Sequence, residues 1–275
     1  MKSRNYLLNI LLLLGLSSSA QTLTKVWTTA NGLKTPESAL FDAPSNKIYV
    51  SNIDGEPSTK DGNGFISILD PDGKINKLKW VTGLNAPKGQ AIYHGNLYVA
   101  DIDELVIINI KDGKISHRIK VENAKFLNDV TVSEDGTIFF SDMKDNKIYS
   151  YANGKLELWS DNKLINNPNG VWAEKGNLYI GTNQILEADL KSKEIKVLVD
   201  KCGGIDGLEK LENGQFLYSN WEGRIFVTKG NESIKLLDTV ADKKNTADIY
   251  FIPGKNLILV PTFMANSVDA YQFKP

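Results

Sequence analysis

The sequence of 275 residues predicts an all-β fold, a six-bladed β-propeller closed by an N-terminal strand. Six short hydrophobic segments share one pattern and are bounded by turn residues: NKIYVSN, GNLYVAD, GTIFFSD, GNLYIGT, GQFLYSN and KNLILVPT. They recur roughly every 40 residues, the length of a propeller blade with about four strands. We expect each segment to be the second strand of one blade.

Hairpin signals within the units support this interpretation. The third unit reads VTVSED, GTIFFSD, KIYSYA and KLELWS, with Asp135-Gly136 and Asn153-Gly154 at two of its turns. Such dipeptides between alternating strands are typical of β-hairpins. No segment keeps a 3.6-residue apolar period with helix caps, so we expect long helices to be nearly absent.

The last unit predicts how the ring closes. It contains three strand patterns, DIYFI, NLILVP and SVDAYQF, and no fourth before Pro275. Thr22 to Thr29 has the pattern of an outer strand, in which Trp27 takes the place of Trp80 and Trp159 in other outer strands. An N-terminal strand in the sixth blade would remove an exposed edge. We expect the three indoles to pack between neighbouring blades.

The first 20 residues have the order of a secretory signal peptide. Lys2 and Arg4 precede an apolar run that includes Leu11 to Leu14, and Ser-Ser-Ser-Ala follows before Gln21. The run is short for a membrane span. The prediction is therefore a signal peptide at residues 1–20, a single propeller domain at residues 21–275, and export to the periplasm or the medium.

Charge and cysteine content exclude several classes of protein. There are 32 Lys and Arg against 33 Asp and Glu, without a basic stripe, so the electrostatic footprint of nucleic-acid binding is missing. Cys202 is the only cysteine, which excludes an internal disulfide, and its Cys-Gly-Gly setting favours an unreactive thiol. We expect a monomer that acts on a small molecule, with no nucleic-acid partner and no membrane span.

Polar residues at the beginning of the inner strands predict a metal site. The innermost strand of each blade lines the central channel, so equivalent residues there converge on one mouth. The six equivalent positions are Glu37, Lys88, Asn128, Asn169, Asp206 and Ala247. Glu37, Asn128, Asn169 and Asp206 offer oxygen, a hard ligand set that suits Ca²⁺, with Mg²⁺, Mn²⁺ and Zn²⁺ as alternatives. Buried carboxylates would repel one another unless a cation neutralises them, and Lys88 supplies part of that charge.

Turn chemistry and histidine catalysis are the alternatives to a metal site for polar residues of this chain. Asn-Gly, Asn-Asp and Asp-Gly commonly satisfy backbone groups in turns, but four oxygen donors in register favour a metal site. His94 falls in a turn at the opposite end of its blade and His117 in an outer strand, so neither is expected to act in catalysis.

The second strands return to the same face, and their ends are candidates for a substrate wall. These residues are Asp101, Asp142, Asn183, Asn220, Trp221, Thr262 and Phe263. Trp221 opens a Trp-Glu-Gly loop and could either stack on a ligand or cap the strand. The first blade also carries an insertion, IDGEPSTKDGNG, from Ile53 to Gly64. This loop could be a lid over the site or a disordered, solvated loop, and the sequence leaves both interpretations open.

At four short motifs the chain resembles the regucalcin and gluconolactonase (senescence marker protein) family of six-bladed propellers, which is related in plan to paraoxonases. The motifs are Pro36-Glu37-Ser38, Leu127-Asn128-Asp129, Pro168-Asn169-Gly170 and Ile205-Asp206-Gly207. The resemblance implies that Glu37, Asn169 and Asp206 hold a divalent cation, that Asn128 lies beside metal and substrate, and that Asp206 is the general base. The chain departs from the family at Phe126, where members that act on sugar lactones often have Arg, and after Glu37, where Pro and Trp are common.

The function predicted from the sequence is metal-dependent hydrolysis of a lactone or related ester. Asp206, or alternatively Asp129, would take a proton from the attacking water. The predicted substrate contacts are Asn128, Lys88, Asp101, Asp142, Asn220 and Trp221. The alternative is a non-enzymatic exported propeller that binds a small molecule, glycan or protein and keeps calcium for rigidity.

Overall fold

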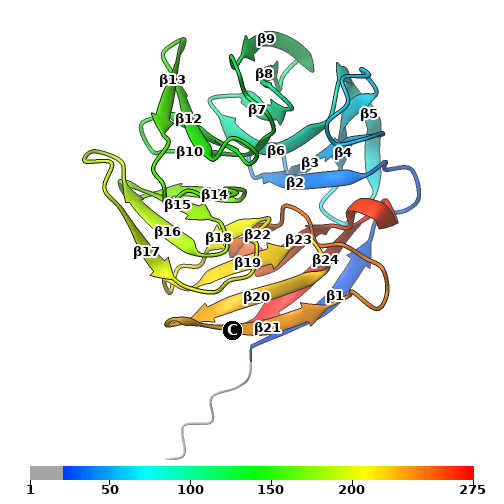
Figure 1. Ribbon diagram of the computed structural model, residues 1–275. Helices are drawn as coiled ribbons and strands as arrows, with labels where there is room; N and C mark the ends of the chain where they lie inside the picture. Colours follow the sequence, from blue (N-terminus) through cyan, green and yellow to red (C-terminus); the bar gives the residue numbers. More distant parts are fainter. Residues whose placement is uncertain (1–20) are drawn as a thin grey trace, which may run out of the picture.

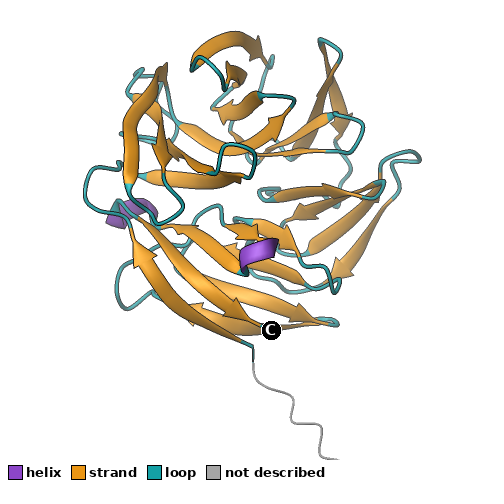
Figure 2. Ribbon diagram, turned by 180° about the vertical axis from the view of Figure 1, so that it is seen from behind, coloured by secondary structure: helices purple, strands orange, loops and turns teal. Residues whose placement is uncertain are grey.

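The computed structural model describes residues 21–275, and the predicted signal peptide at residues 1–20 lies outside the described residues. The chain forms six four-stranded antiparallel sheets that are arranged as blades around a ring (Figure 1). Within residues 21–275 the helical structure is limited to two short 3₁₀ turns, η1 (Pro253–Lys255) and η2 (Phe263–Ala265), visible in purple in Figure 2. The prediction of an all-β six-bladed propeller is confirmed.

Each blade uses its strands in simple up-and-down order, with the first strand innermost in the ring. From the first blade to the sixth the strands are β2 (Pro36–Asp42), β3 (Lys47–Asn52), β4 (Gly64–Leu69), β5 (Ile75–Leu84); β6 (Pro87–Tyr93), β7 (Asn96–Asp101), β8 (Glu104–Asn109), β9 (Lys114–Lys120); β10 (Leu127–Val132), β11 (Ile138–Asp142), β12 (Lys147–Ala152), β13 (Lys155–Ser160); β14 (Val171–Glu174), β15 (Asn177–Gly181), β16 (Ile185–Asp189), β17 (Ile195–Val199); β18 (Leu208–Lys210), β19 (Phe216–Asn220), β20 (Arg224–Lys229), β21 (Glu232–Asp238); and β22 (Tyr250–Ile252), β23 (Leu257–Pro261), β24 (Val268–Lys274), β1 (Thr22–Thr28).

The ring closes through its two ends, as predicted. Strand β1 pairs antiparallel with β24, so that Thr22 lies opposite Lys274 and Thr28 opposite Asp269. Figure 1 shows the blue β1 beside the red β24. The pairing satisfies the outer edge of β24, which would otherwise be open to another chain.

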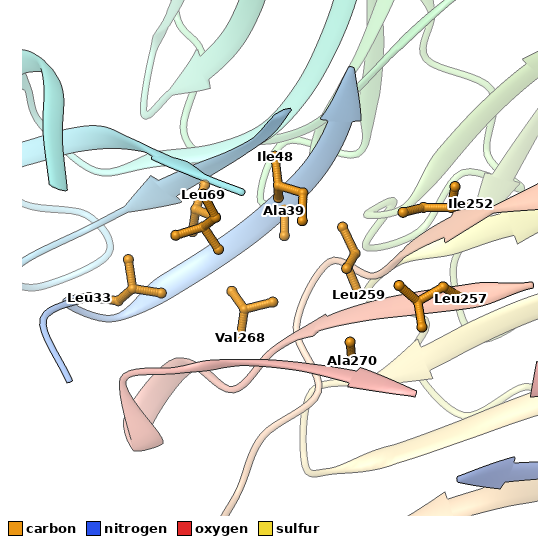
Figure 3. Packing of buried hydrophobic residues seen from close by; sticks show 10 residues of the cluster. Leu33, Ala39, Ile48, Leu69, Ile252, Leu257, Leu259, Val268 and Ala270 are labelled. Carbon is orange, nitrogen blue, oxygen red and sulfur yellow. The ribbon is translucent and has the colours of Figure 1, made fainter. Parts of the chain in front are cut away.

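Hydrophobic side chains pack between neighbouring blades and hold the ring together. Ala39 and Ile48 of the first blade meet Leu259 and Val268 of the sixth (Figure 3), and Trp27 packs against this cluster. Burial of such side chains is worth roughly 1.5–3 kcal/mol each. The closing contact is therefore apolar as well as hydrogen-bonded.

The other two outer-strand indoles also lie between blades. Trp80 packs against Tyr49, with ring centroids 5.1 Å apart, in the cluster that joins the first and second blades. Trp159 meets Phe139 edge to face at 5.5 Å, where the third and fourth blades join. The expectation for Trp27, Trp80 and Trp159 is confirmed.

Two smaller expectations can also be compared with the structure. Cys202 is free and buried, and burial raises the pKa of its thiol to about 11, which makes the thiol a poor nucleophile at neutral pH. Among residues 21–275, no helix has both the length and the apolar composition that crossing a membrane requires.

Candidate active site

A cavity of about 570 Å³ opens at the channel mouth where the inner strands begin. Its walls include Glu37, Lys88, Asn128, Asn169 and Asp206, five of the six equivalent positions that the sequence singles out. The sixth, Ala247, lies instead in a buried apolar cluster with Ile53, Ala86, Ile102 and Phe263. The structure therefore brings the four predicted oxygen donors and one lysine together on a single cavity.

Irregular strand pairing aims the first three of these side chains at the cavity. The register of the inner strand shifts between Pro36 and Ser38, between Pro87 and Gln90, and between Leu127 and Val130. Glu37, Lys88 and Asn128 fall within these shifts. A β-bulge leaves a residue out of the ladder and redirects its side chain, and such bulges are frequent beside active sites.

Glycines let the inner strands of neighbouring blades approach one another closely beside the cavity. A Cβ atom at Gly89 would lie 2.3 Å from Asp129 Oδ1, and one at Gly170 would lie 2.5 Å from the backbone oxygen of Asp206. Neither position can accept a side chain without moving the neighbouring strand. These glycines directly follow Lys88 and Asn169, so the close approach brings the cavity residues within reach of one ligand.

Serines in the second strands fix the backbone beside the same positions. The hydroxyl oxygens of Ser51, Ser141 and Ser219 accept hydrogen bonds from the backbone N–H groups of Ser38, Asp129 and Gly207, at 2.9–3.0 Å. The residues that precede those three N–H groups in the chain are Glu37, Asn128 and Asp206. This role of the serines was not predicted from the sequence, although the repeated Ser-Asn and Ser-Asp strand ends carry its signal.

Glu37 is the most unusual group in the cavity. Its side chain is 5% exposed, and within the described residues its buried Oε2 atom has no hydrogen-bond partner. Burial raises the pKa of the Glu37 carboxyl well above its ordinary value, and the charges of Asp206 and Asp248 raise it further, whereas Lys88 acts in the opposite direction. An orphaned buried carboxylate oxygen is costly, and a bound cation would satisfy it.

Asp206 is the second acid of the cavity. Burial raises its pKa to about 7, the charge of Asp248 adds to the shift, and a hydrogen bond from Asn169 opposes it. In that bond the Asn169 amide nitrogen donates to Asp206 Oδ1 at 2.7 Å. Because the nitrogen faces Asp206, the Asn169 carbonyl oxygen is left for another ligand.

Lys88 connects the cavity floor to the insertion of the first blade. Its ammonium donates to the backbone oxygens of Pro57, at 3.0 Å, and Ala86, at 2.8 Å. Burial lowers the pKa of Lys88 to about 8, and the charge of Glu37 acts against this shift. The insertion also supplies Ile53 and Glu56 to the wall, so this loop covers part of the cavity.

The structure places Asp129, the alternative general base predicted from the sequence, outside the wall of this cavity. Its carboxylate accepts backbone N–H bonds from Val130 and Val171, both at 2.7 Å. Asp129 lines a separate cavity of about 420 Å³ at the other end of the channel, with Glu209 and Asp248. One of its oxygens thus links the third blade to Val171 at the start of the fourth, and the other accepts from Val130 within its own strand.

Asp101, Asp142 and Asn220, which the sequence predicts as substrate contacts, do not line the cavity either. Asp101 accepts N–H bonds from Asn85 and Ala86, and Asp142 accepts them from the backbone of residues 125 and 126. Asn220 donates from its amide to the backbone oxygens of residues 203 and 204. These side chains hold the segments that cross from one blade to the next.

Of the other residues predicted to form the substrate wall, only some line the cavity. Trp221 and Phe263 line the cavity, whereas Asn183 and Thr262 do not. The structure adds Thr35, Met143 and Met264, which the sequence analysis did not single out. Met143 directly follows the second strand of its blade, as Trp221 does, so the repeat carried a signal for Met143 but none for Thr35 and Met264.

The possible metal ligands of the cavity are not a cluster of His, Cys, Asp and Glu side chains alone. In the part of the chain that the structure describes, no group of three or more His, Cys, Asp or Glu residues is arranged to hold a metal ion. The cavity instead combines two buried carboxylates, Glu37 and Asp206, with two carboxamides, Asn128 and Asn169, and the exposed Glu56 also lies in its wall. His94 and His117 do not line it.

No protein-family model matches the chain, and no curated protein matches its sequence. Solved structures of similar fold include one titled "putative gluconolactonase", with 15% identity, a TM-score of 0.68 and coverage of 93% of each chain. A streptogramin B lyase has 14% identity and a TM-score of 0.67, covering 92% of this chain and 98% of its own. A catalytically inactive virginiamycin B lyase from Staphylococcus aureus with quinupristin has 15% identity and a TM-score of 0.63, covering 92% and 99%. At these identities the likeness shows the propeller fold alone.

The pKa of Asp206 predicts a pH effect on stability in protein kept metal-free with a chelator. A carboxyl whose pKa is about 7 in the folded chain and near 3.8 when unfolded binds its proton more tightly in the folded state. Its contribution to folding is therefore present at low pH and is lost as the pH rises from about 4 to about 7. Relative to wild type, Asp206→Asn should gain on the order of 2–3 kcal/mol between pH 5 and pH 8.

Urea unfolding of both proteins at the two pH values measures this difference. A stability difference between wild type and Asp206→Asn that does not change from pH 5 to pH 8 would contradict the raised pKa.

Proposed function

We propose that the chain is an exported, metal-dependent hydrolase of a lactone or related carboxylic ester, with Ca²⁺ as the preferred cation. The observation that carries the proposal is the buried Oε2 atom of Glu37, which has no hydrogen-bond partner in the described chain and shares one cavity with Asp206, Asn128 and Asn169. Two buried acids and two amides in one cavity need positive charge and offer the oxygens to bind it.

The residues present fit a hard cation. Carboxylate and carboxamide oxygens are the ligands that Ca²⁺ accepts, and its six to eight positions leave room for water or substrate oxygens. Mg²⁺ and Mn²⁺ use similar oxygen ligands, so they remain alternatives. The wall of the cavity contains neither His nor Cys, which makes Zn²⁺ the poorest fit.

The chain's own residues would supply the proton transfers of hydrolysis. When bound, the cation would stabilise negative charge on the carbonyl oxygen of the substrate. Asp206, with a pKa raised to about 7, would accept a proton from the attacking water, whose oxygen bonds to the carbonyl carbon. The carbon–oxygen bond of the ester then breaks, and Asp206 returns the proton to the departing alkoxide. The product of a lactone is a hydroxy acid.

Other residues of the cavity would orient the reactants and limit water. Asn169 holds Asp206 through the 2.7 Å hydrogen bond, which leaves Oδ2 of Asp206 for proton transfer. Asn128 lies on the same wall and would contact the substrate. Lys88 holds the first-blade insertion over the cavity through Pro57. Preorganised polar groups of this kind lower the barrier because they need not reorganise during the reaction.

The solved structures of similar fold support this proposal only in that one is titled a putative gluconolactonase and shares the propeller fold. The neighbours titled as lyases make elimination the competing reaction, since a lyase breaks a bond without adding water across it. The assay of the proposed function should therefore follow the origin of the product oxygen.

Calcium is expected to stabilise the wild-type protein through Glu37 and Asp206. At about 100 times its dissociation constant, a ligand that binds only the folded state adds about 2.7 kcal/mol. We expect Glu37→Gln and Asp206→Asn to abolish this gain, because each removes a charged oxygen ligand. Glu212→Gln is the matched control, since Glu212 is exposed and lies outside the cavity.

Thermal unfolding of the four proteins with and without CaCl₂ at pH 8 gives the result. Wild type and Glu212→Gln should shift equally. The metal site is contradicted if no divalent ion shifts wild type, or if Glu37→Gln shifts as wild type does.

Hydrolytic activity is expected to depend on the same residues. On a panel of lactones and carboxylic esters, wild-type protein should release the acid, with a loss of at least about 100-fold in kcat on chelation or in Asp206→Asn. Asp129→Asn should retain its kcat wherever the variant folds, because Asp129 faces the other cavity. In H₂¹⁸O, hydrolysis places one labelled oxygen in the new carboxylate, whereas elimination places none. A panel without turnover would favour the binding propeller instead.

A further inference from the structure

The cavity wall beyond the proposed cation ligands is largely apolar. It is formed by Ile53, Pro57, Phe126, Met143, Trp221, Phe263 and Met264. These side chains come from loops of the first, third, fifth and sixth blades, so they surround the proposed ligands on several sides. A pocket of several hundred Å³ with an apolar wall and a few convergent polar groups is typical of sites for small organic molecules.

Few polar side chains remain to receive a hydroxylated substrate. Of the polar residues in the wall, four belong to the proposed cation set, and the ammonium of Lys88 already donates to two backbone oxygens. Apart from Asn128, which would contact the reacting group, only Thr35, Glu56 and the indole N–H of Trp221 are left to bind the rest of the substrate. Each hydroxyl group buried without a partner weakens binding, so this wall disfavours a sugar with many hydroxyls.

Phe126 occupies the wall beside the proposed catalytic groups. Its ring is buried, and the ammonium groups of Lys88 and Lys144 each lie 4.4 Å from its centroid. These cation–π contacts hold the ring in place. The ring therefore offers a fixed apolar surface where a substituent next to the reacting carbonyl would lie.

Two large apolar side chains stay exposed at the rim. Trp221 is 44% exposed and Met264 is 64% exposed, and both line the cavity. Trp221 meets Phe263 edge to face, with ring centroids 5.5 Å apart. A ligand that covers these side chains would remove their apolar surface from water, which favours binding.

The backbone on this side of the cavity is strained in a way that suits a binding site. Phe263 has φ 47° and Thr35 has φ 46°, values that bulky and β-branched residues rarely adopt. Asn266 supports both, because its N–H donates to the Phe263 oxygen and its side-chain oxygen accepts from Thr35 N–H. Such strain is often found at ligand sites, where the surrounding structure holds it.

We propose that the substrate is a lactone or ester with an apolar alkyl or aromatic substituent, an inference that rests on the proposed hydrolase function. The carbonyl group lies at the end of the cavity that holds Glu37, Asn169 and Asp206. The substituent lies against Phe126, Trp221, Phe263 and Met264. Each methylene group buried in this way strengthens binding about fourfold.

Two lactams test this inference without requiring turnover, because an amide in place of the ester resists hydrolysis. One is a γ-lactam with a hexyl substituent, and the other is gluconolactam, which carries hydroxyl groups instead. Isothermal titration calorimetry in saturating CaCl₂ should give a dissociation constant at least about tenfold lower for the hexyl lactam. Trp221→Ser and Met264→Gln, both at exposed positions, should weaken its binding about fivefold or more.

Leu158→Gln is the matched control, since Leu158 is a 47% exposed apolar residue of β13 outside the cavity. It should bind the hexyl lactam as wild type does. Tighter or equal binding of gluconolactam, no measurable binding of the hexyl lactam, or equal weakening in Leu158→Gln would overturn the inference. Selective binding of the hexyl lactam without hydrolysis of any ester would instead contradict the proposed hydrolase function. The inference that the cavity binds a ligand with an apolar substituent would still hold.

Discussion

Closure of the ring is the constraint on which the rest of the structure depends. The pairing of β1 with β24 completes the sixth blade and brings it against the first. At that junction Asp248 N–H donates to the backbone oxygen of Glu37 at 3.0 Å, and Ser38 forms a parallel bridge with Asp248. Residues from opposite ends of the chain therefore meet at the channel. Without closure, Glu37 would not be held near Asp206.

Closure also forces acidic groups into a space where they repel one another. Glu37 and Asp206 are buried and Asp248 is partly buried, and burial together with repulsion between these acids raises the pKa of Glu37 and Asp206. Burial likewise raises the pKa of Asp248 to about 7. Protons or a cation must compensate this charge. The symmetric ring thus creates a one-sided site, because only some of its equivalent positions carry oxygen donors.

The fold could be predicted from the sequence because its signals are local and repeated. Six similar strand patterns, paired turn residues and the outer strand at residues 22–28 each follow from short segments. The convergence of Glu37, Asn128, Asn169 and Asp206 followed from the same repeat. The apolar wall followed only in part, since Trp221, Phe263 and Met143 come at the ends of second strands, whereas Pro57 and Met264 lie at positions that the repeat does not mark.

The predicted site residues that lie outside the cavity wall do so for related physical reasons. Asp129 is adjacent to Asn128, but successive residues of a strand point in different directions, and Asp129 reaches the other cavity. Asp101 and Asp142 end second strands on the expected face, yet backbone N–H groups of the crossing segments occupy their carboxylates. A carboxylate that binds substrate and one that binds its own backbone look alike in a sequence.

The central claim is that Glu37, Asn169 and Asp206 bind a cation, and anomalous diffraction tests it most directly. Crystals grown with Mn²⁺ as a scattering substitute for Ca²⁺ should show one strong anomalous peak between these three side chains in wild type. The same experiment on Glu37→Gln crystals should show none. A wild-type peak only at other residues, or no peak at all, would contradict the account.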